Sequence, residues 1–324
     1  MELPEEILAH SVALIDRRLF LATKPRDYIR HVTTSAAKRS LYPSLCHISA
    51  LTTHFNHLAC WCASLILLRD KPRDRALTLE KCMRLARRIR ELNDYHALGA
   101  MVAGIHNTAV HRLAQTRELL NKDTAKDFAR LEILMSTARG HAAYRLAWEN
   151  TTAPGRVPYV PVLMSDLVVA DASGSTFAAQ DTDVPPSTPL TPTSPTSRHA
   201  AAAAAADADA SQRASRLINW PKFEKMGEVL YLIETTQAGI PRHLAAKAEL
   251  IEDVRALLLD VSVLDDDGLY ARSCAVEPGA GGTGGGGGAG GSMRKSFMDR
   301  LLAAPLTATN GNDGPGLNAM YLRG

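Results

Sequence analysis

The residue types that carry covalent chemistry are present in this 324-residue chain, but their spacing forms no catalytic or metal-binding motif. Cys60 and Cys62 stand too close together for a zinc knuckle, whose paired ligands are separated by two residues. His54 and His57 have no third ligand nearby in the sequence, so structural or surface histidines are the favoured interpretation. The chain is therefore expected to bind no metal and no cofactor.

The glycine-rich stretch 279–291 could suggest a phosphate-binding loop, but it lacks the Gly-Lys-Ser/Thr ending that such a loop requires. It is typical of a linker, so we expect residues 279–324 to form a flexible tail. A second low-complexity stretch, 172–215, is rich in proline and alanine and is expected to be a disordered insert. Residues 1–278, apart from this insert, are predicted to form one domain.

The overall composition allows a large hydrophobic core and gives little support to a charged partner surface. Hydrophobic residues make up 46% of the chain, and 37 basic against 34 acidic residues leave a net charge of +3. This near balance argues against binding of nucleic acid or of an anionic membrane surface. Because no apolar run approaches the ~20 residues of a membrane span, we expect no membrane insertion. The five cysteines are expected to be free thiols in a reducing compartment.

The elements that would position any functional side chain are helices. Apolar residues recur at helical spacing along most of the chain, and no stretch shows the alternation that is typical of a strand. The predicted helices cover residues 3–20, 54–68, 75–92, 98–105, 128–135, 144–148, 158–171, 217–237, 243–259 and 265–274, with a short helix after Asn107 and a loop at 41–46. The predicted fold class is all-α, with helices that cross orthogonally.

The stretch 155–167 organises the rest of the chain. Pro158 and Pro161 impose an extended entry and then a helix start, because proline fixes φ and is tolerated in a first helical turn. The residues from Val162 to Val169 are apolar on nearly every side of that helix. A helix of this kind is either buried or held against a partner.

The same stretch resembles the signature of the catalytic domain of Ras guanine-nucleotide exchange factors. The matching residues are Gly155, Val157, Pro158, Tyr159, Met164, Asp166 and Leu167, whereas Arg156 departs from the Cys or Thr of the family. Further segments resemble the same domain in the same order, and they are residues 3–20, Asn56 with Trp61, 90–98, 110–113, 217–220 and 270–278. The resemblance implies an orthogonal multi-helical domain with a protruding helical hairpin.

The resemblance implies that the hairpin arms, residues 158–171 and 217–237, act on a Ras-like small GTPase. The first arm would displace switch 1 and obstruct the magnesium and phosphate sites, so that GDP is released. Val168 matches the apolar position that disfavours the ion. The family's phosphate-mimicking acid falls on Ala172, so that role is either lost or taken by Asp171. Residues that match hairpin-supporting positions are Pro158, Asp166, Asn219 and Trp220.

Other matching positions would bind switch 2 of the GTPase. They are Thr52, His106, His111, His141 and Tyr159, with Asn107, Arg112 and Lys225 nearby. Histidine stands where the family often has Asn at 106 and Tyr at 111 and 141, which keeps a stacking ring and a hydrogen-bonding group. An alternative role for Tyr159, Arg112 and Asn219 is to hold the base of the hairpin.

The favoured function is therefore nucleotide exchange on a Ras-family GTPase by a cytoplasmic monomer, recruited to membranes through its GTPase or other partners. Exchange needs no covalent chemistry, which agrees with the missing catalytic motif. The alternative is a GTPase-binding module that keeps the fold and has lost exchange, as Arg156, Ala172 and the histidines would allow. An unrelated helical enzyme is the third possibility. Ras, Rap and Ral are all open as the GTPase.

Overall fold

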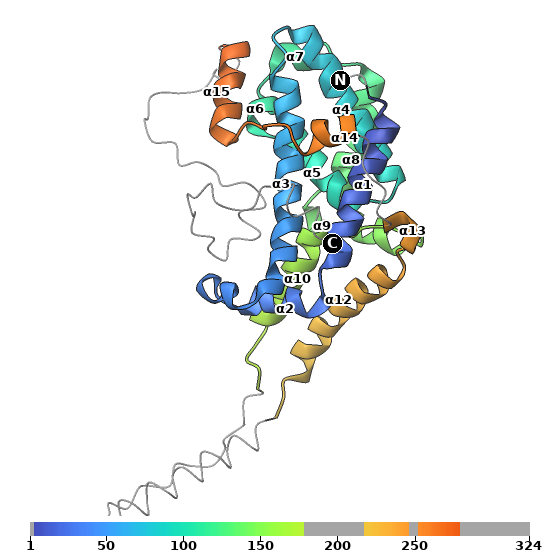
Figure 1. Cartoon of the computed structure of the whole chain (residues 1–324), viewed down its shortest axis with the longest axis vertical. Helices are drawn as coiled ribbons and strands as arrows, with labels where there is room; N and C mark the ends of the chain where they lie inside the picture. The colour runs from blue at the N-terminus through green and yellow to red at the C-terminus, as the bar shows by residue number, and fades with distance from the viewer. Residues whose placement is uncertain (1–2, 178–216, 246–251, 279–324) are drawn as a thin grey trace, which may run out of the picture.

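The computed structural model describes residues 3–177, 217–245 and 252–278, and these residues form an orthogonal assembly of helices (Figure 1). The α-helices are α1 (Glu5–Ala22), α2 (Pro25–Thr33), α3 (Cys46–Leu67), α4 (Pro72–Glu91), α5 (Tyr95–Ile105), α6 (Thr108–His111), α7 (Ala114–Glu118), α8 (Lys122–Met135), α9 (Ala138–Glu149), α10 (Val160–Ala172), α12 (Trp220–Ala238), α13 (Arg242–Ala245), α14 (Glu252–Leu258) and α15 (Asp266–Val276). Two 3-10 turns, η1 (Ala36–Leu41) and η2 (Pro43–Leu45), precede α3. The predicted all-α class is confirmed.

Helix α3 runs through the centre of the assembly and contacts α1, α4, α5 and α15 (Figure 1). Its buried residues, including Leu51, Phe55, Leu58 and Trp61, point to several sides, which suits a helix that neighbours surround. The indole N–H of Trp61 donates to the carbonyl oxygen of Leu257 over 2.7 Å. This bond attaches the segment around α14 to the core.

The sequence predicted most of the helices, but several of the predicted boundaries were wrong and two helices, α2 and α7, were not predicted. Helix α3 begins at Cys46 rather than His54, because its first turns already bury apolar residues at helical spacing. The predicted loop 41–46 lies in the two 3-10 turns and the start of α3. Helices α2 and α7 were missed because both are short and largely polar. Within the predicted helix 243–259, residues 246–251 lie outside the described part, as do most of the insert 172–215 and the whole tail 279–324.

All five cysteines are free thiols, and Cys62 and Cys82 are buried. None of the described helices combines the length and the apolar character that crossing a bilayer requires.

A cluster of buried polar groups lies beneath the loop that leads into α10. Asp16 of α1 and Asp94, which caps α5 by accepting from the Ala97 N–H at 3.0 Å, are both fully buried. The Nε2 atom of buried His54 lies 3.3 Å from Oδ1 of Asp16. Burial raises the pKa of Asp16 well above its ordinary value, and the neighbouring charge of Asp94 raises it further. Burial also raises the pKa of Asp94 to about 7.

These shifts predict how stability depends on pH. A carboxyl group with a raised pKa holds its proton better in the folded state, so its contribution to stability falls as pH rises from about 4 to about 7. Asp16→Asn replaces the titrating carboxyl group with a permanently neutral amide, and the melting temperature of the variant should rise relative to that of the wild type as pH rises from about 5 to about 7.5. The buried histidines act in the opposite direction but are present in both proteins, so the difference reports on Asp16 together with the neighbouring Asp94 and His54.

Thermal unfolding followed by circular dichroism across this pH range measures the effect. Asp127→Asn is the control, because it makes the same change at the protein surface, where Asp127 pairs with Arg87. Equal pH profiles for Asp16→Asn and wild type would contradict the prediction.

Candidate functional site

Helices α10 and α12 form an antiparallel pair, and the end of α10 lies beside the start of α12 in the lower half of Figure 1. This pair corresponds to the helical hairpin that the family resemblance implied. Figure 1 shows its arms running beside α2 and away from the upper part of the fold, where α7 and α15 lie. The hairpin has a base, at the start of α10 and the end of α12, and a distal end that includes residues 168–177 and 217–223.

The base of the hairpin is held at the three residues 155–157. The N–H of Gly155 donates to the carbonyl of Gly239, just after α12, and Nε of Arg17 donates to the carbonyl of Gly155 over 2.7 Å. Val157 forms a parallel bridge with Asp94, in which its N–H donates to Asn93 and its carbonyl accepts from Tyr95. Gly155 has φ +77°, a conformation that side chains disfavour. The turn before Pro158 is therefore fixed to both α1 and α12.

Tyr159 lies inside the fold, where it supports the start of α10. Its ring is so close to α5 that a Cβ added to Gly99 would stand 2.4 Å from the Tyr159 ring, so only glycine fits there. The ring also lies edge-on to Tyr144 and His141, with centroids 5.8 and 5.7 Å away, and the Tyr144 hydroxyl accepts from the Tyr159 N–H. This burial agrees with the alternative that Tyr159 holds the base of the hairpin.

Arg156, the departure from the family signature, folds back on α9 rather than toward the hairpin face. Its guanidinium carbon lies 3.9 Å from the centre of the Trp148 ring, and the side chain donates to the carbonyls of Trp148 and Thr151. The substitution thus adds contacts at the end of α9.

The distal end of the hairpin is braced by Lys222, which the sequence analysis did not single out. The ammonium group of this buried lysine donates to the carbonyls of Asp171 and Gly174 over 2.9 and 3.1 Å. It also lies 2.9 Å from Oδ1 of Asp171. The last turn of α10 is thereby capped by a cation from α12, as the helix dipole favours. The carboxylate of Asp171 is consequently engaged within the hairpin.

The outward face of α10 presents apolar side chains. Val168 and Val169 are 47% and 65% exposed, and Ala172 is exposed beside them. Farther back on α10, Asp166 forms a two-pronged pair with Arg145 of α9, with N···O distances of 2.7 and 2.9 Å. This pair fixes α10 to α9 below the exposed valines.

The predicted switch-2 residues lie on several elements. His106 and Asn107 stand between α5 and α6, where Nε2 of His106 is 2.8 Å from Glu132 and Asn107 caps α6 through the Ala109 N–H. His111 is exposed at the end of α6. His141 stands at φ +62°, and burial lowers its pKa, an effect to which the charge of Arg145 adds. It is therefore neutral at pH 7.

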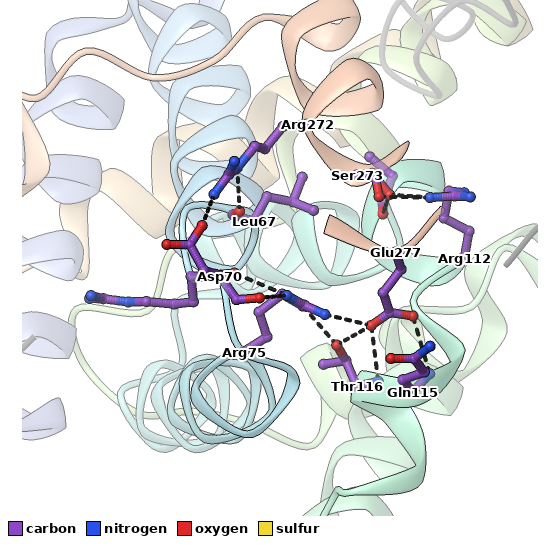
Figure 2. A network of polar contacts seen from close by, with 11 residues as sticks. Leu67, Asp70, Arg75, Arg112, Gln115, Thr116, Arg272, Ser273 and Glu277 are labelled. Atoms are coloured by element: carbon purple, nitrogen blue, oxygen red, sulfur yellow. Dashed lines mark hydrogen bonds and ion pairs between the residues drawn. The ribbon is translucent and has the colours of Figure 1, made fainter. Parts of the chain in front are cut away.

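The remaining predicted residues fall into exposed and packed groups. Lys225 is exposed on α12, and Thr52 is half-buried on α3. Pro158 is buried, and Asn219 donates from its side-chain amide to the Ser175 carbonyl, which closes the distal end of the hairpin. Trp220 is 69% exposed, so its indole does not pack between the arms. Arg112 donates to the carbonyl and hydroxyl of Ser273, on α15 (Figure 2).

A family model described as the RasGEF domain matches residues 7–224. The chain belongs to the RasGEF domain family. The match covers the loop before α10, all of α10 and the start of α12, and it ends before the part of the hairpin base at the end of α12.

Similar proteins carry names that agree with this family. The chain is 27% identical over 183 residues to Ras guanine nucleotide exchange factor A of Dictyostelium discoideum, an alignment that covers 56% of this chain and 29% of that protein. It is 32% identical over 163 residues to factor K of the same organism, covering 50% of this chain and 10% of that protein. It is 29% identical over 170 residues to the Ras-specific guanine nucleotide-releasing factor RalGPS1 of Gallus gallus, an alignment that covers 52% of this chain and 28% of that protein. The chain therefore spans less than a third of each of these relatives.

The brace at the distal end predicts the effect of Lys222→Met. This change keeps the length of the side chain but removes the cation that caps α10, so the last turn of α10 should fray. Amide hydrogen exchange in residues 168–177 should speed up about tenfold or more, since hydrogen bonds to a charged group stabilise by about 1.5–3 kcal/mol.

Lys225→Met is the matched control for this prediction, because Lys225 lies exposed on the same helix. It should leave exchange in residues 168–177 near the wild-type rate. Equal exchange in the two variants would show that Lys222 does not hold the hairpin.

Proposed function

We propose that this RasGEF-family domain promotes GDP release from a Ras-family small GTPase by inserting the outward face of α10 beside the nucleotide. An exchange factor shifts the nucleotide equilibrium only by binding the nucleotide-free GTPase better than the loaded one. A rigid helix that inserts beside the nucleotide, here called a wedge, meets this requirement. A nucleotide-loaded GTPase can bind such a helix only by losing its own contacts to magnesium and phosphate. The observation that carries the proposal is an exposed valine pair on a helix that is fixed at both ends.

The exposed Val168 and Val169 are suited to an apolar, steric mode of action. A branched aliphatic side chain placed near a magnesium site offers no oxygen ligand, and it displaces the water that the ion retains. Because Asp171 is paired with Lys222, and Ala172 carries no charge, we propose that phosphate mimicry contributes little. Exclusion of the ion would then dominate the release of GDP.

We propose that the second part of the interface contacts switch 2. Its direct contacts would be the solvent-accessible Thr52, His106, Asn107, His111, His141 and Lys225. Tyr159 and Arg112 would support the residues that contact switch 2 without contacting it themselves, since Tyr159 is buried and Arg112 is hydrogen-bonded to Ser273. Residues 1–278 would constitute the exchange domain.

One observation favours the alternative, a GTPase-binding module without exchange. Asp171 is the only acid at the distal end of α10, and its partner Lys222 withholds it from a bound GTPase. If phosphate mimicry were essential in this chain, binding would persist and release would fail. The two functions therefore differ in one measurable property, the rate at which bound GDP leaves.

Release of a fluorescent GDP analogue from a panel of Ras, Rap and Ral GTPases tests the proposal. The full chain should accelerate release from at least one of them, and Val168→Asp should reduce the acceleration about tenfold or more, because a carboxylate can coordinate the ion that the valine excludes. Leu77→Asp is the control, since Leu77 is a similarly exposed apolar residue on α4. It should retain wild-type activity.

Three results would contradict the proposal in different ways. Acceleration that Val168→Asp and Leu77→Asp reduce equally would remove α10 from the mechanism. Binding of a nucleotide-free GTPase without any acceleration would establish the alternative. No binding to any member of the panel would show that the function lies elsewhere.

A further inference from the structure

The segment that carries Asn107 and His111 consists of two helices that are too short to be stable alone. Helix α6 has four residues and α7 has five, whereas isolated helices shorter than about 12 residues are marginal in water. Asn107 caps α6, but Leu113, at the cap position of α7, offers no side-chain acceptor. The first N–H groups of α7 must therefore find an acceptor elsewhere.

That acceptor is Glu277, which follows α15 and lies far along the chain (Figure 2). Its Oε2 accepts from the N–H of Gln115 over 3.2 Å, and its Oε1 accepts from the N–H and hydroxyl of Thr116 over 3.2 and 2.6 Å. A carboxylate at these N–H groups performs the work of a local N-cap residue and complements the helix dipole. Helix α7 is thus capped by the C-terminal end of the domain.

A buried arginine completes the arrangement around Glu277. Nη2 of Arg75 lies 2.9 Å from Oε1 of Glu277, and Nε of Arg75 donates to the Thr116 hydroxyl over 2.9 Å. The same guanidinium donates to the Asp70 carbonyl over 2.6 Å (Figure 2). Burial alone would raise the pKa of Glu277, but hydrogen bonds from Thr116 and Arg75 outweigh it and the pKa is lowered. Glu277 therefore stays ionised at neutral pH.

Ser273 holds α6 in the same way. Its hydroxyl donates to the Ala109 carbonyl over 2.6 Å, and its hydroxyl and carbonyl both accept from Arg112, over 3.1 and 2.8 Å. Arg112 directly follows His111. Arg117 of α7 in turn donates to the His111 carbonyl over 3.1 Å, so the two short helices are also tied to each other at this residue.

We infer that Ser273 and Glu277 are positioning residues for GTPase binding, an inference that rests on the proposed function. Both side chains are buried, so neither touches the GTPase itself. They fix the conformation of α6 and α7 and thereby present Asn107 and His111 to switch 2. Both residues lie beyond residue 224, where the family-model match ends, in the segment 270–278 that resembles the end of the same domain.

The test compares Glu277→Gln and Ser273→Ala with Asp70→Asn, all in the full chain. Asp70→Asn is the matched control, because the Asp70 carboxylate pairs with Arg272 of the same helix α15, at 2.5 Å, without touching α6 or α7. GDP release is measured at increasing GTPase concentration. Glu277→Gln and Ser273→Ala should raise the half-saturating GTPase concentration about tenfold and change the maximal rate less than twofold, whereas Asp70→Asn should change neither.

A double-mutant cycle separates positioning from a general loss of structure. His111→Ala should weaken GTPase binding in the wild-type background. It should have a smaller effect in the Ser273→Ala background, because Ser273→Ala has already displaced His111. Additive effects would contradict the inference. Circular dichroism verifies that each variant is folded, and Ser273→Ala decides the matter if Glu277→Gln does not fold.

The outcomes also distinguish the inference from the proposed function. Wild-type protein that releases GDP, with Glu277→Gln and Ser273→Ala indistinguishable from Asp70→Asn, would overturn the positioning role and leave the exchange function intact. Wild-type protein that neither binds nor activates any GTPase of the panel would overturn both.

Discussion

The hydrogen bond from Arg17 to the Gly155 carbonyl fixes the point from which both arms of the hairpin depart. Gly155 accepts from α1 on its carbonyl side and donates to Gly239, at the end of α12, on its amide side. Two residues later, Val157 pairs with the start of α5. One short loop therefore sets the direction of α10 relative to α1, α5 and α12. The left-handed conformation of Gly155 is what lets the chain turn at this junction.

Similar polar contacts occur farther along the hairpin. They hold α10 in place, and the apolar side chains of its outward face stay exposed to solvent. Arg145 and Asp166 attach the middle of α10 to α9, and Lys222 caps its end. Each bond constrains α10 without covering Val168 or Val169. A helix held in this way can keep its position when it meets a partner, so little binding free energy is lost in ordering it. Rigidity and exposure are both needed for a wedge that acts on another protein.

Local patterns in the sequence were enough to predict the fold class, and the resemblance to the exchange-factor family predicted the hairpin. The proline spacing around Pro158 and the apolar run after it marked the start of α10, and helical periodicity marked most of the remaining elements. The supporting contacts could not be found in this way, because their partners lie far apart in the chain. Lys222 contacts a carbonyl 51 residues earlier, and Glu277 caps a helix 161 residues earlier. Helix α7, which was missed because it is short and largely polar, also has a cap that is not local.

The preference for a nucleotide-free GTPase is the property that most directly tests a wedge mechanism. The measurement is the dissociation constant of the full chain for a Ras-family GTPase, once stripped of nucleotide and once loaded with GDP and magnesium. Binding to the stripped form should be tighter by about 100-fold or more, and by linkage the chain then weakens GDP binding by the same factor. Equal affinity for the two forms would contradict the mechanism, because a protein that binds both states equally well shifts no equilibrium.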